Sequence, residues 1–391
     1  MKGTKFTAVA AGAVMAFTLA ACSGGGAGDD TSSTSADPSA SAGGSAMAQG
    51  GSIGVAMPNQ TIERWIADGD AVKSGLEAEG FDVDLQYAGD DIPTQAQQIE
   101  SMITNGADLL IVAAIDGTAL SGQLEAAAQA GIPVIAYDRL IRDSANVDFY
   151  VTFDNYQVGV QQATSLLVGL GVLNADGSEG TATGPFNIEL FAGSLDDNNA
   201  HFFFSGGIDT LQPYIDSGVL VVKSGQMEIA QVATRNWQQE TAQKRMEDLL
   251  TSTYSGGDKV VGVLAPNDGV ARGILTALGN AGYGPTIADG MPVVTGQDAE
   301  IASVKLINDD VQYSTIFKDT RKLAAQAVIA SKSFLMGEVP EANDTETYDN
   351  GVKVIPSFLL SSDIVYKDNV QSLLIDSGYW SAEEVASGLA E

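Results

Sequence analysis

Short apolar segments alternate with helical patterns along the chain from residue 52 onward. The apolar segments are continuous runs, which is typical of parallel strands buried on both faces. In the first half these predicted strands lie at 53–57, 83–87, 109–114, 134–137 and 150–153. In the second half they lie at 186–191, 219–222, 260–264, 292–295 and 313–317. Strands that alternate with helices predict a doubly wound parallel α/β sheet in each half.

Segments with helical spacing separate the strands. They lie at 61–79, 91–106, 117–130, 156–170, 241–251, 270–281 and 320–336, and a further strand is predicted near 352–360. Asp91 is expected to cap the second helix, with Pro93 in its first turn, and Gly131 to close the third. Because 391 residues are too many for one compact core, the two halves predict two lobes with a cleft between them.

The amino terminus has the pattern of an export signal. Lys2 and Lys5 precede an apolar run over residues 8–21, which is shorter than the roughly 20 residues that a membrane span needs. The run ends in Leu19-Ala20-Ala21-Cys22, which resembles the lipobox of bacterial lipoproteins. We therefore expect a signal peptide at 1–21 and lipidation of Cys22. The alternative is an ordinary signal peptide with a chance cysteine.

Residues 22–50 form a stretch that contains almost nothing to bury. Gly, Ser, Ala, Thr and Asp dominate it, and this composition predicts a flexible tether. A lipid anchor followed by a tether would hold an exported folded part at the outer face of the cytoplasmic membrane. The membrane would then be contacted through the anchor only.

The charge and the rare residue types exclude several classes of function. The net charge of −31, with 50 acids against 19 bases, repels nucleic acids, so no nucleic-acid partner is expected. Cys22 is the single cysteine and His201 the single histidine. A histidine-based metal site or a Ser-His-Asp site would have to use His201, and no metal is expected. No G-x-G-x-x-G follows a strand, so no cofactor is expected either.

Polar side chains follow nearly every predicted strand. In an open α/β sheet, ligands bind at the carboxyl ends of the strands, and these side chains are therefore the candidate binding residues. From the first half they are Asn59, Gln60, Arg64, Trp65, Asp138 and Arg139. From the second half they are Asp196, Asp197, Asn198, Asn199, Arg235, Trp237, Asn267, Asp268, Gln297, Asp298 and Lys318.

These residue types match a neutral polyol. A hydroxyl group can donate to a carboxylate while it accepts from an arginine, lysine or amide, and the C–H face of a pyranose ring lies well against an indole. A nucleotide would need a phosphate cradle, and an amino acid a concentrated clamp for its two charges. The alternative is structural: Asp and Asn at such junctions are often helix caps, and Asp91 and Asp196 are expected to cap rather than to bind. An isolated tryptophan is more often a core residue.

Several motifs carry a resemblance to a known family. They are Glu63-Arg64-Trp65, Ala136-Tyr137-Asp138-Arg139-Leu140-Ile141, Thr152-Phe153-Asp154-Asn155, Gly193-Ser194 with Asp197-Asn198-Asn199-Ala200, Ser224-Gly225-Gln226, Gly296-Gln297-Asp298-Ala299 and Tyr313-Ser314-Thr315-Ile316-Phe317-Lys318-Asp319-Thr320. On these residues the chain resembles the periplasmic sugar-binding proteins of ABC importers, in the xylose-binding and multiple-monosaccharide-binding group.

The resemblance implies a class I fold, in which two parallel-sheet lobes are joined by three hinge crossings. It implies an N-terminal lobe of residues 51–154 with 319–350, and a C-terminal lobe of 155–318 with 351–391. It implies no enzymatic activity, capture of a monosaccharide, and delivery to an ABC permease that an ATPase drives. The protein is expected to be a monomer. Carried onto matching positions, the resemblance implies that Trp65 and Trp237 stack on the sugar and that the sugar ligands are Arg64, Asp138, Arg139, Asp197, Asn199, Asn267, Asp298 and Lys318.

Three questions stay open at this point. The bound form could instead be presented to a receptor as a sugar sensor. An exported carbohydrate-active enzyme would use a carboxylate pair such as Asp138 and Asp298, but the neighbouring cations should keep both ionised, and the reaction needs an acid with a raised pKa. Xylose, glucose, galactose and arabinose differ too little for the sequence to choose between them.

Overall fold

The computed structural model describes residues 50–390. The predicted signal peptide at 1–21, the predicted lipidation site Cys22 and all but the last residue of the predicted tether lie outside the described residues. Within 50–390, no helix is both long and apolar enough to cross a membrane.

The first sheet has six parallel strands in the order β11-β5-β4-β3-β1-β2. In chain order these are β1 (Ser52–Met57), β2 (Asp82–Tyr87), β3 (Leu109–Val112), β4 (Val134–Tyr137), β5 (Phe149–Phe153) and β11 (Ser357–Leu360). The chain order reverses between β1 and β3, so the crevice at their carboxyl ends is a topological switch point, where open α/β sheets bind ligands.

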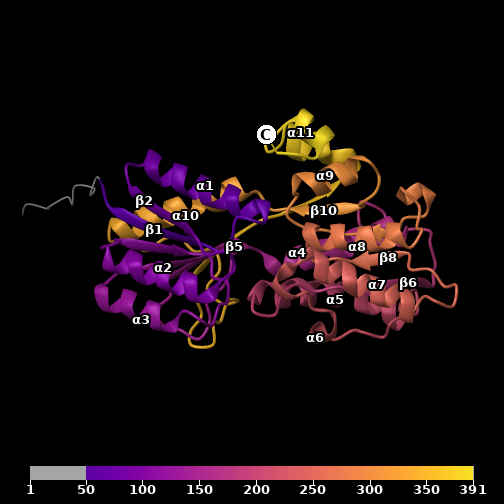
Figure 1. Ribbon diagram of the computed structural model, residues 1–391, viewed down its shortest axis with the longest axis horizontal. Coiled ribbons are helices and arrows are strands. Elements are labelled where there is room, and N and C mark those ends of the chain that lie inside the picture. The colour runs from indigo at the N-terminus through magenta and orange to yellow at the C-terminus, as the bar shows by residue number, and fades with distance from the viewer. Residues whose placement is uncertain (1–49, 391) are drawn as a thin grey trace, which may run out of the picture. The chain divides into compact units, whose positions relative to one another are not determined.

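Helices cover both faces of this sheet because its strands are apolar on both sides. They are α1 (Glu63–Ala78), α2 (Ile92–Thr104), α3 (Ser121–Ala130) and α10 (Thr320–Leu335). Leu109 and Ile111 pack with α1 and α10 on one face, whereas Leu110 and Val112 pack with α2 and α3 on the other. Figure 1 shows α10, drawn in orange, among the indigo and purple elements of the first half of the chain.

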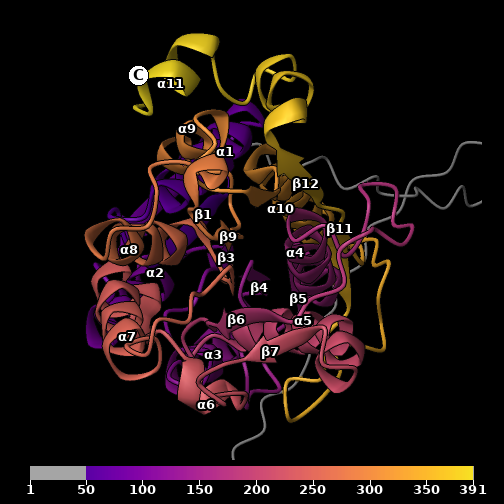
Figure 2. The same cartoon turned by 90° about the vertical axis from the view of Figure 1, so that its right-hand side faces the viewer.

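The second sheet has four parallel strands in the order β7-β6-β8-β9. They are β6 (Phe186–Leu190), β7 (Leu220–Val222), β8 (Gly262–Leu264) and β9 (Val293–Val294). Helices α4 (Asn155–Gly169) and α5 (Asn198–Asp216) pack on one face, and α7 (Gln239–Ser252) and α8 (Asp268–Asn280) on the other (Figure 2). The short helix α6 (Ile229–Val232) follows β7. Two parallel-sheet lobes were predicted, and both are present.

The strand predicted at 313–317 does not extend the second sheet. It is β10 (Ser314–Phe317), which pairs antiparallel with β12 (Asp363–Tyr366), a strand that the sequence pattern did not predict. The cause is the segment after β9: Asp298 and Ala299 have positive φ angles of 96° and 51°, which interrupt regular pairing beside β9. Helices α9 (Ile301–Asn308) and α11 (Ala382–Ser387) pack together next to this pair.

The chain crosses between the lobes three times, as predicted. The crossings follow β5 at Asp154, β10 at Lys318 and β11 at residues 361–362. The predicted assignment of residues 357–360 to the C-terminal lobe is contradicted by the structure. Residues 357–360 form β11, which pairs with β5 in parallel and so belongs to the N-terminal lobe.

Two helices begin later than predicted, because a side chain ties up the preceding backbone. Before α1, Asn59 Oδ1 accepts from the backbone N–H groups of Thr61 and Ile62, 3.0 and 2.9 Å away. Before α3, Asp116 Oδ1 accepts from the N–H of Thr118 at 2.8 Å. Such local bonds compete with the helix. The predicted cap at Asp91 is present, since its side chain accepts from Thr94 N at 2.8 Å.

Candidate ligand-binding cleft

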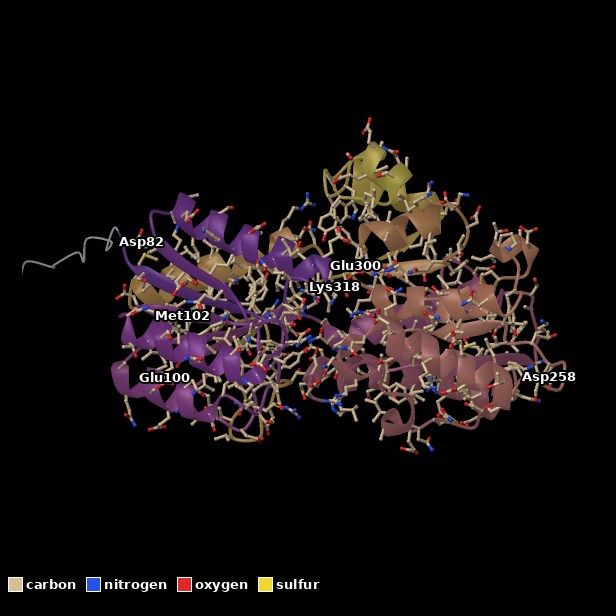
Figure 3. The ribbon with its side chains drawn as sticks, viewed as in Figure 1. Asp82, Glu100, Met102, Asp258, Glu300 and Lys318 are labelled. Carbon is tan, nitrogen blue, oxygen red and sulfur yellow. The ribbon has the colours of Figure 1, made fainter. Side chains whose placement is uncertain are left out.

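A cavity with about 340 Å³ of empty space lies between the lobes at the carboxyl ends of the strands. All ten binding residues that the resemblance implies line it. Three further residues complete the lining: Ile62, Phe203 and Gln297. Lys318, labelled in Figure 3, lies where the elements of the two lobes meet. The structure therefore brings together side chains that are up to 256 positions apart in the sequence, from Ile62 to Lys318.

Arg64 is held between carboxylates from both lobes. It is the second residue of α1, and its side chain is 7% exposed. Its Nη2 donates to Asp138 Oδ2 and to Asp68 Oδ2, both at 2.8 Å, and its Nη1 lies 3.4 Å from Asp298 Oδ1 in the C-terminal lobe. Asp68 also accepts from the hydroxyl of Tyr137. The carboxylate of Asp68 therefore fixes the direction in which the guanidinium group of Arg64 points.

Asp138 leaves β4 with a positive φ of 61°. Its carbonyl oxygen accepts three hydrogen bonds, from Tyr150 Oη at 2.6 Å, Thr152 Oγ1 at 2.9 Å and Asn199 Nδ2 at 2.8 Å. Burial opposes the charge of this carboxylate, but the cations of Arg64, Lys318 and Arg139 outweigh it and hold the pKa of Asp138 below its ordinary value. The expectation that neighbouring cations keep Asp138 ionised agrees with this direction.

Arg139 and Asp197 form an ion pair across the cleft. Arg139 Nε lies 3.0 Å from Asp197 Oδ2, without the alignment of a hydrogen bond. Asp197 caps α5 by accepting from the N–H of Asn199 at 2.9 Å. Burial raises the pKa of Asp197, and the charge of Arg139 opposes that rise. A cation from one lobe thus faces an anion from the other.

Asp298 and Lys318 form the pair nearest to a hinge crossing. Lys318 Nζ lies 2.9 Å from Asp298 Oδ1, and the lysine is 3% exposed. The backbone N–H of Asp298 donates to the carbonyl of Ile316 at 2.9 Å. That of Ala299 donates to Thr315 Oγ1 at 3.1 Å. These bonds to β10 hold the unusual backbone conformation of Asp298 in place.

The charges of the cavity lining are balanced. Arg64, Arg139 and Lys318 contribute three cations, and the carboxylates of Asp138, Asp197 and Asp298 contribute three anions. All six side chains are at least nine-tenths buried. Each cation lies within 3.0 Å of an anion, so the cavity has no net charge to offer an ionic ligand. This pattern favours a neutral ligand that bonds to both signs.

Aromatic rings from the two lobes line the same cavity. Trp65 is 2% exposed, and the guanidinium carbons of Arg64 and Arg139 lie 4.6 and 5.0 Å from its ring centroid. Trp237 meets Phe203 edge to face, with the centroids 6.3 Å apart. Both tryptophans therefore belong to the cavity wall rather than to a remote core.

Asn199 and Asn267 also have structural roles in the described residues. Asn199 bridges the lobes, because its Nδ2 donates to the carbonyl of Asp138 while its Oδ1 accepts from Tyr150 and Asn155, each at 3.0 Å. Asn267 Oδ1 caps α8 by accepting from Val270 N at 2.9 Å. The capping alternative raised for such residues therefore applies to Asn267 and to Asp197. Asp196 does not cap α5.

Three lining residues are not among the binding residues that the resemblance implies. Ile62 and Phe203 are apolar, and nothing in their sequence positions separates them from core residues. Gln297 was selected by its position two residues after the predicted strand at 292–295, but it is not among the ligands that the resemblance implies. It is 2% exposed, and its Oε1 has no hydrogen-bond partner within the described chain.

The fold and the site define a class of protein, and comparison with known proteins agrees. The model of the periplasmic binding protein domain matches residues 53–338, and the chain belongs to this family. The chain is 52% identical over 335 residues to the multiple sugar-binding periplasmic receptor ChvE of Rhizobium radiobacter, covering 86% of this chain and 92% of that protein. It is 35% identical to the D-xylose-binding periplasmic protein of Escherichia coli strain K12, covering 85% and 92%.

Among solved structures, a solute-binding protein of an ABC transporter from Clostridium phytofermentans matches with a TM-score of 0.79. It is 45% identical, the match covers 85% of this chain and 99% of that one, and that protein contains bound β-D-glucose. The resemblance to sugar-binding proteins and the two-lobed fold are thereby confirmed.

Proposed function

We propose that this protein captures a neutral monosaccharide between its two lobes and delivers it to an ABC permease driven by an ATPase. The observation that carries the proposal is the balanced lining of the cleft, in which three cations and three carboxylates from both lobes lie beside two tryptophans. D-Glucose and D-xylose are the first candidates. One structural relative contains β-D-glucose, and the name of another relative states D-xylose.

The chemistry of hydroxyl groups explains why this lining suits a sugar. Each hydroxyl can accept from Arg64, Arg139 or Lys318 while it donates to a neighbouring carboxylate. Hydrogen bonds to ionised partners are roughly twice as strong as bonds between neutral groups. The rings of Trp65 and Trp237 offer flat apolar surfaces for the C–H faces of the sugar ring. A sugar phosphate would bring charge that no unpaired cation of the lining offsets.

Closure of the lobes is the proposed mechanism of capture. Residues from both lobes meet in the cleft, as in the pair of Arg139 with Asp197 and the bridge made by Asn199. Bending at the three crossings would open the cleft to a sugar. Closure would then expel water, and the hydrogen bonds to the sugar would become stronger in the drier site.

We further propose that the protein is exported, that lipidation of Cys22 anchors it at the outer face of the cytoplasmic membrane, and that it acts as a monomer. We propose binding rather than catalysis. The cations around Asp138 hold its pKa below its ordinary value, so Asp138 does not supply the acid that glycoside hydrolysis needs.

A thermal-shift screen tests the proposed ligand class. Neutral pentoses and hexoses, the matching sugar phosphates and free amino acids are each added to the protein at the same concentration. A ligand present at 100 times its dissociation constant stabilises the folded state by about 2.7 kcal/mol, so a true ligand raises the melting temperature clearly. The proposal predicts shifts with one or more neutral monosaccharides. A shift with sugar phosphates or amino acids alone would contradict it.

A further inference from the structure

A second cavity adjoins the ligand-binding cleft and shares part of its wall. Ile62, Trp237 and Asn267 line both. The second cavity, here called the outer compartment, has about 990 Å³ of empty space, part of it open to solvent. Its remaining lining residues are Thr61, Glu63, Asp90, Asn236, Gln238, Gln239, Glu240, Gly269, Arg272 and Glu300. A monosaccharide held in the cleft leaves this volume unused.

The outer compartment has polar atoms that lack partners. Trp237 is 8% exposed and borders both cavities, yet its Nε1–H donates to no group within residues 50–390. Glu63 Oε1 is shielded from solvent and accepts no hydrogen bond there, although the same carboxyl group accepts from the backbone N–H of Ile301. Buried polar groups are normally satisfied, so a donor and an acceptor without partners on the walls of a cavity indicate a ligand that bonds to them.

The charge of the outer compartment limits what it can hold. Four carboxyl groups line it, from Glu63, Asp90, Glu240 and Glu300, against the single guanidinium of Arg272. Arg272 is already paired, because its Nη2 lies 2.6 Å from Glu300 Oε2. An anionic group would therefore be repelled here, whereas neutral hydroxyls can bond to the carboxyl groups and to the side-chain amides of Asn236, Gln238 and Gln239.

We propose that the outer compartment is a subsite for a second sugar unit, so that the protein also binds a neutral disaccharide. One unit occupies the cleft, and the second extends past Trp237, where its hydroxyls bond to the indole N–H and to Glu63. This inference rests on the proposed monosaccharide function, because it places the first unit in that site.

Gly269 offers a way to fill the outer compartment. It lies in the first turn of α8 and lines the outer compartment but not the cleft. A Cβ at Gly269 would lie 3.8 Å from its nearest atoms, Arg272 Nη2 and Asn267 Oδ1, which is ordinary contact, so a large side chain has room to begin there. Gly279, near the end of the same helix, has no atom within 4 Å of a Cβ and lines neither cavity. Gly279→Phe is therefore the matched control for Gly269→Phe.

Titration calorimetry with cellobiose, xylobiose and maltose, each freed of monosaccharide by chromatography, tests the inference. We expect at least one disaccharide to bind within tenfold of the affinity of its own monosaccharide. Gly269→Phe should lower the affinity for that disaccharide at least tenfold and leave the affinity for the monosaccharide within twofold. The retained affinity for the monosaccharide also shows that the variant is folded. Gly279→Phe should change neither.

Two results would overturn the inference. The first is binding of monosaccharides without binding of any of the three disaccharides. The second is an equal loss of both ligands in Gly269→Phe while Gly279→Phe keeps both. A failure of every monosaccharide and every disaccharide would instead reject the proposed function itself, so the two failures are distinguishable.

Discussion

At the residue scale, the site depends on backbone conformations that the sequence does not reveal. Asp138, Trp237 and Asp298 all have positive φ angles, of 61°, 56° and 96°. Such conformations cost about 1–3 kcal/mol each in a residue other than glycine and persist only where the surroundings enforce them. Strand-end position and the family resemblance together predicted which residues reach the cleft, whereas strand-end position alone also selected Arg235 and Asp268, which do not line it. Neither could predict these angles, because distant residues such as Tyr150 and Ile316 enforce them through hydrogen bonds.

The same limit applies to the supports behind the site. Asp268 is fully buried and accepts from Gln312 Nε2 at 2.9 Å, Thr315 Oγ1 at 3.0 Å and the N–H of Glu300 at 2.9 Å. Burial, followed by the charge of Glu300, raises its pKa. In the sequence Asp268 is one acid next to Asn267. Asp268 supports the segment that carries Asp298 through its bonds to Glu300 and to Thr315 of β10. The sequence does not show that β10 lies beside Asp268.

The ion pair across the cleft gives a prediction with an adjacent control. Asp197→Asn keeps an acceptor that can cap α5 but removes the negative charge that faces Arg139. We expect a loss of about 1.5–3 kcal/mol of sugar binding, the range for a hydrogen bond to a charged group. Asp196→Asn should have little effect, because Asp196 does not line the cleft. Calorimetry on both variants checks this, and equal affinities would show that Asp197 does not contact the ligand.

Gly193 has no side chain, and the indole ring of Trp237 occupies the space that a Cβ would fill. A Cβ at Gly193 would lie 2.0 Å from Trp237 Cη2, so Gly193→Ala must displace the indole. Overpacking of this kind costs about 1–3 kcal/mol, and we expect sugar affinity to fall and the tryptophan emission to shift. Gly279→Ala, which adds a methyl group in open space, should preserve both. An unchanged spectrum with unchanged affinity in Gly193→Ala would refute this expectation.

At the element scale, continuous apolar runs predicted the strands buried on both faces, and most element boundaries followed. The exceptions have local causes. β9 is short because the segment that carries Asp298 begins soon after it. β12 (Asp363–Tyr366) was missed because its apolar run, Ile364-Val365-Tyr366, is only three residues long. α1 and α3 begin late because Asn59 and Asp116 bond to the backbone ahead of them.

Glu63, the first residue of α1, gives a prediction for the pH dependence of sugar binding. Glu63 faces Glu300, Arg272 and Glu384 from the other lobe, and the backbone N–H of Ile301 donates to its carboxyl group. Burial and the charge of Glu300 raise the pKa of Glu63 from 4.5 to about 7. If opening the lobes exposes Glu63, its pKa returns toward 4.5. Closure then takes up a proton, so protonation of Glu63 favours the closed state. This free-energy contribution to closure is fully present below pH 4.5 and is lost as the pH rises to about 7.

Sugar affinity should therefore weaken between pH 4.5 and 7, and the slope should be smaller in Glu63→Gln. Glu77→Gln is the control, because Glu77 lies on the same helix, is exposed and is paired only with Lys73 at 3.7 Å. Dissociation constants at pH 5, 6 and 7.5 for the three proteins provide the test. A slope in Glu63→Gln as steep as that of the parent protein would assign the pH dependence to another group.

At the scale of the whole molecule, repetition of the α/β pattern predicted two lobes, and the family resemblance predicted three crossings. The third crossing was placed about ten residues too early. Residues 351–356 are irregular, and β11 has only four residues, so its alignment with β5 depends on pairing that no local pattern specifies. The composition of the cleft, by contrast, followed from sequence position because parallel strands deliver their carboxyl ends to one edge of each sheet.

The central claim is that a neutral monosaccharide binds between the lobes in a lining of balanced charge. Calorimetric titration of the protein with D-glucose and D-xylose, repeated at low and high salt, tests it most directly. We predict one saturable site per chain for at least one of the two sugars, with a micromolar or tighter dissociation constant, equivalent to about −8 kcal/mol or better. We also predict little salt dependence, since a neutral ligand is not attracted by long-range charge. The absence of saturable binding to either sugar would contradict the central claim.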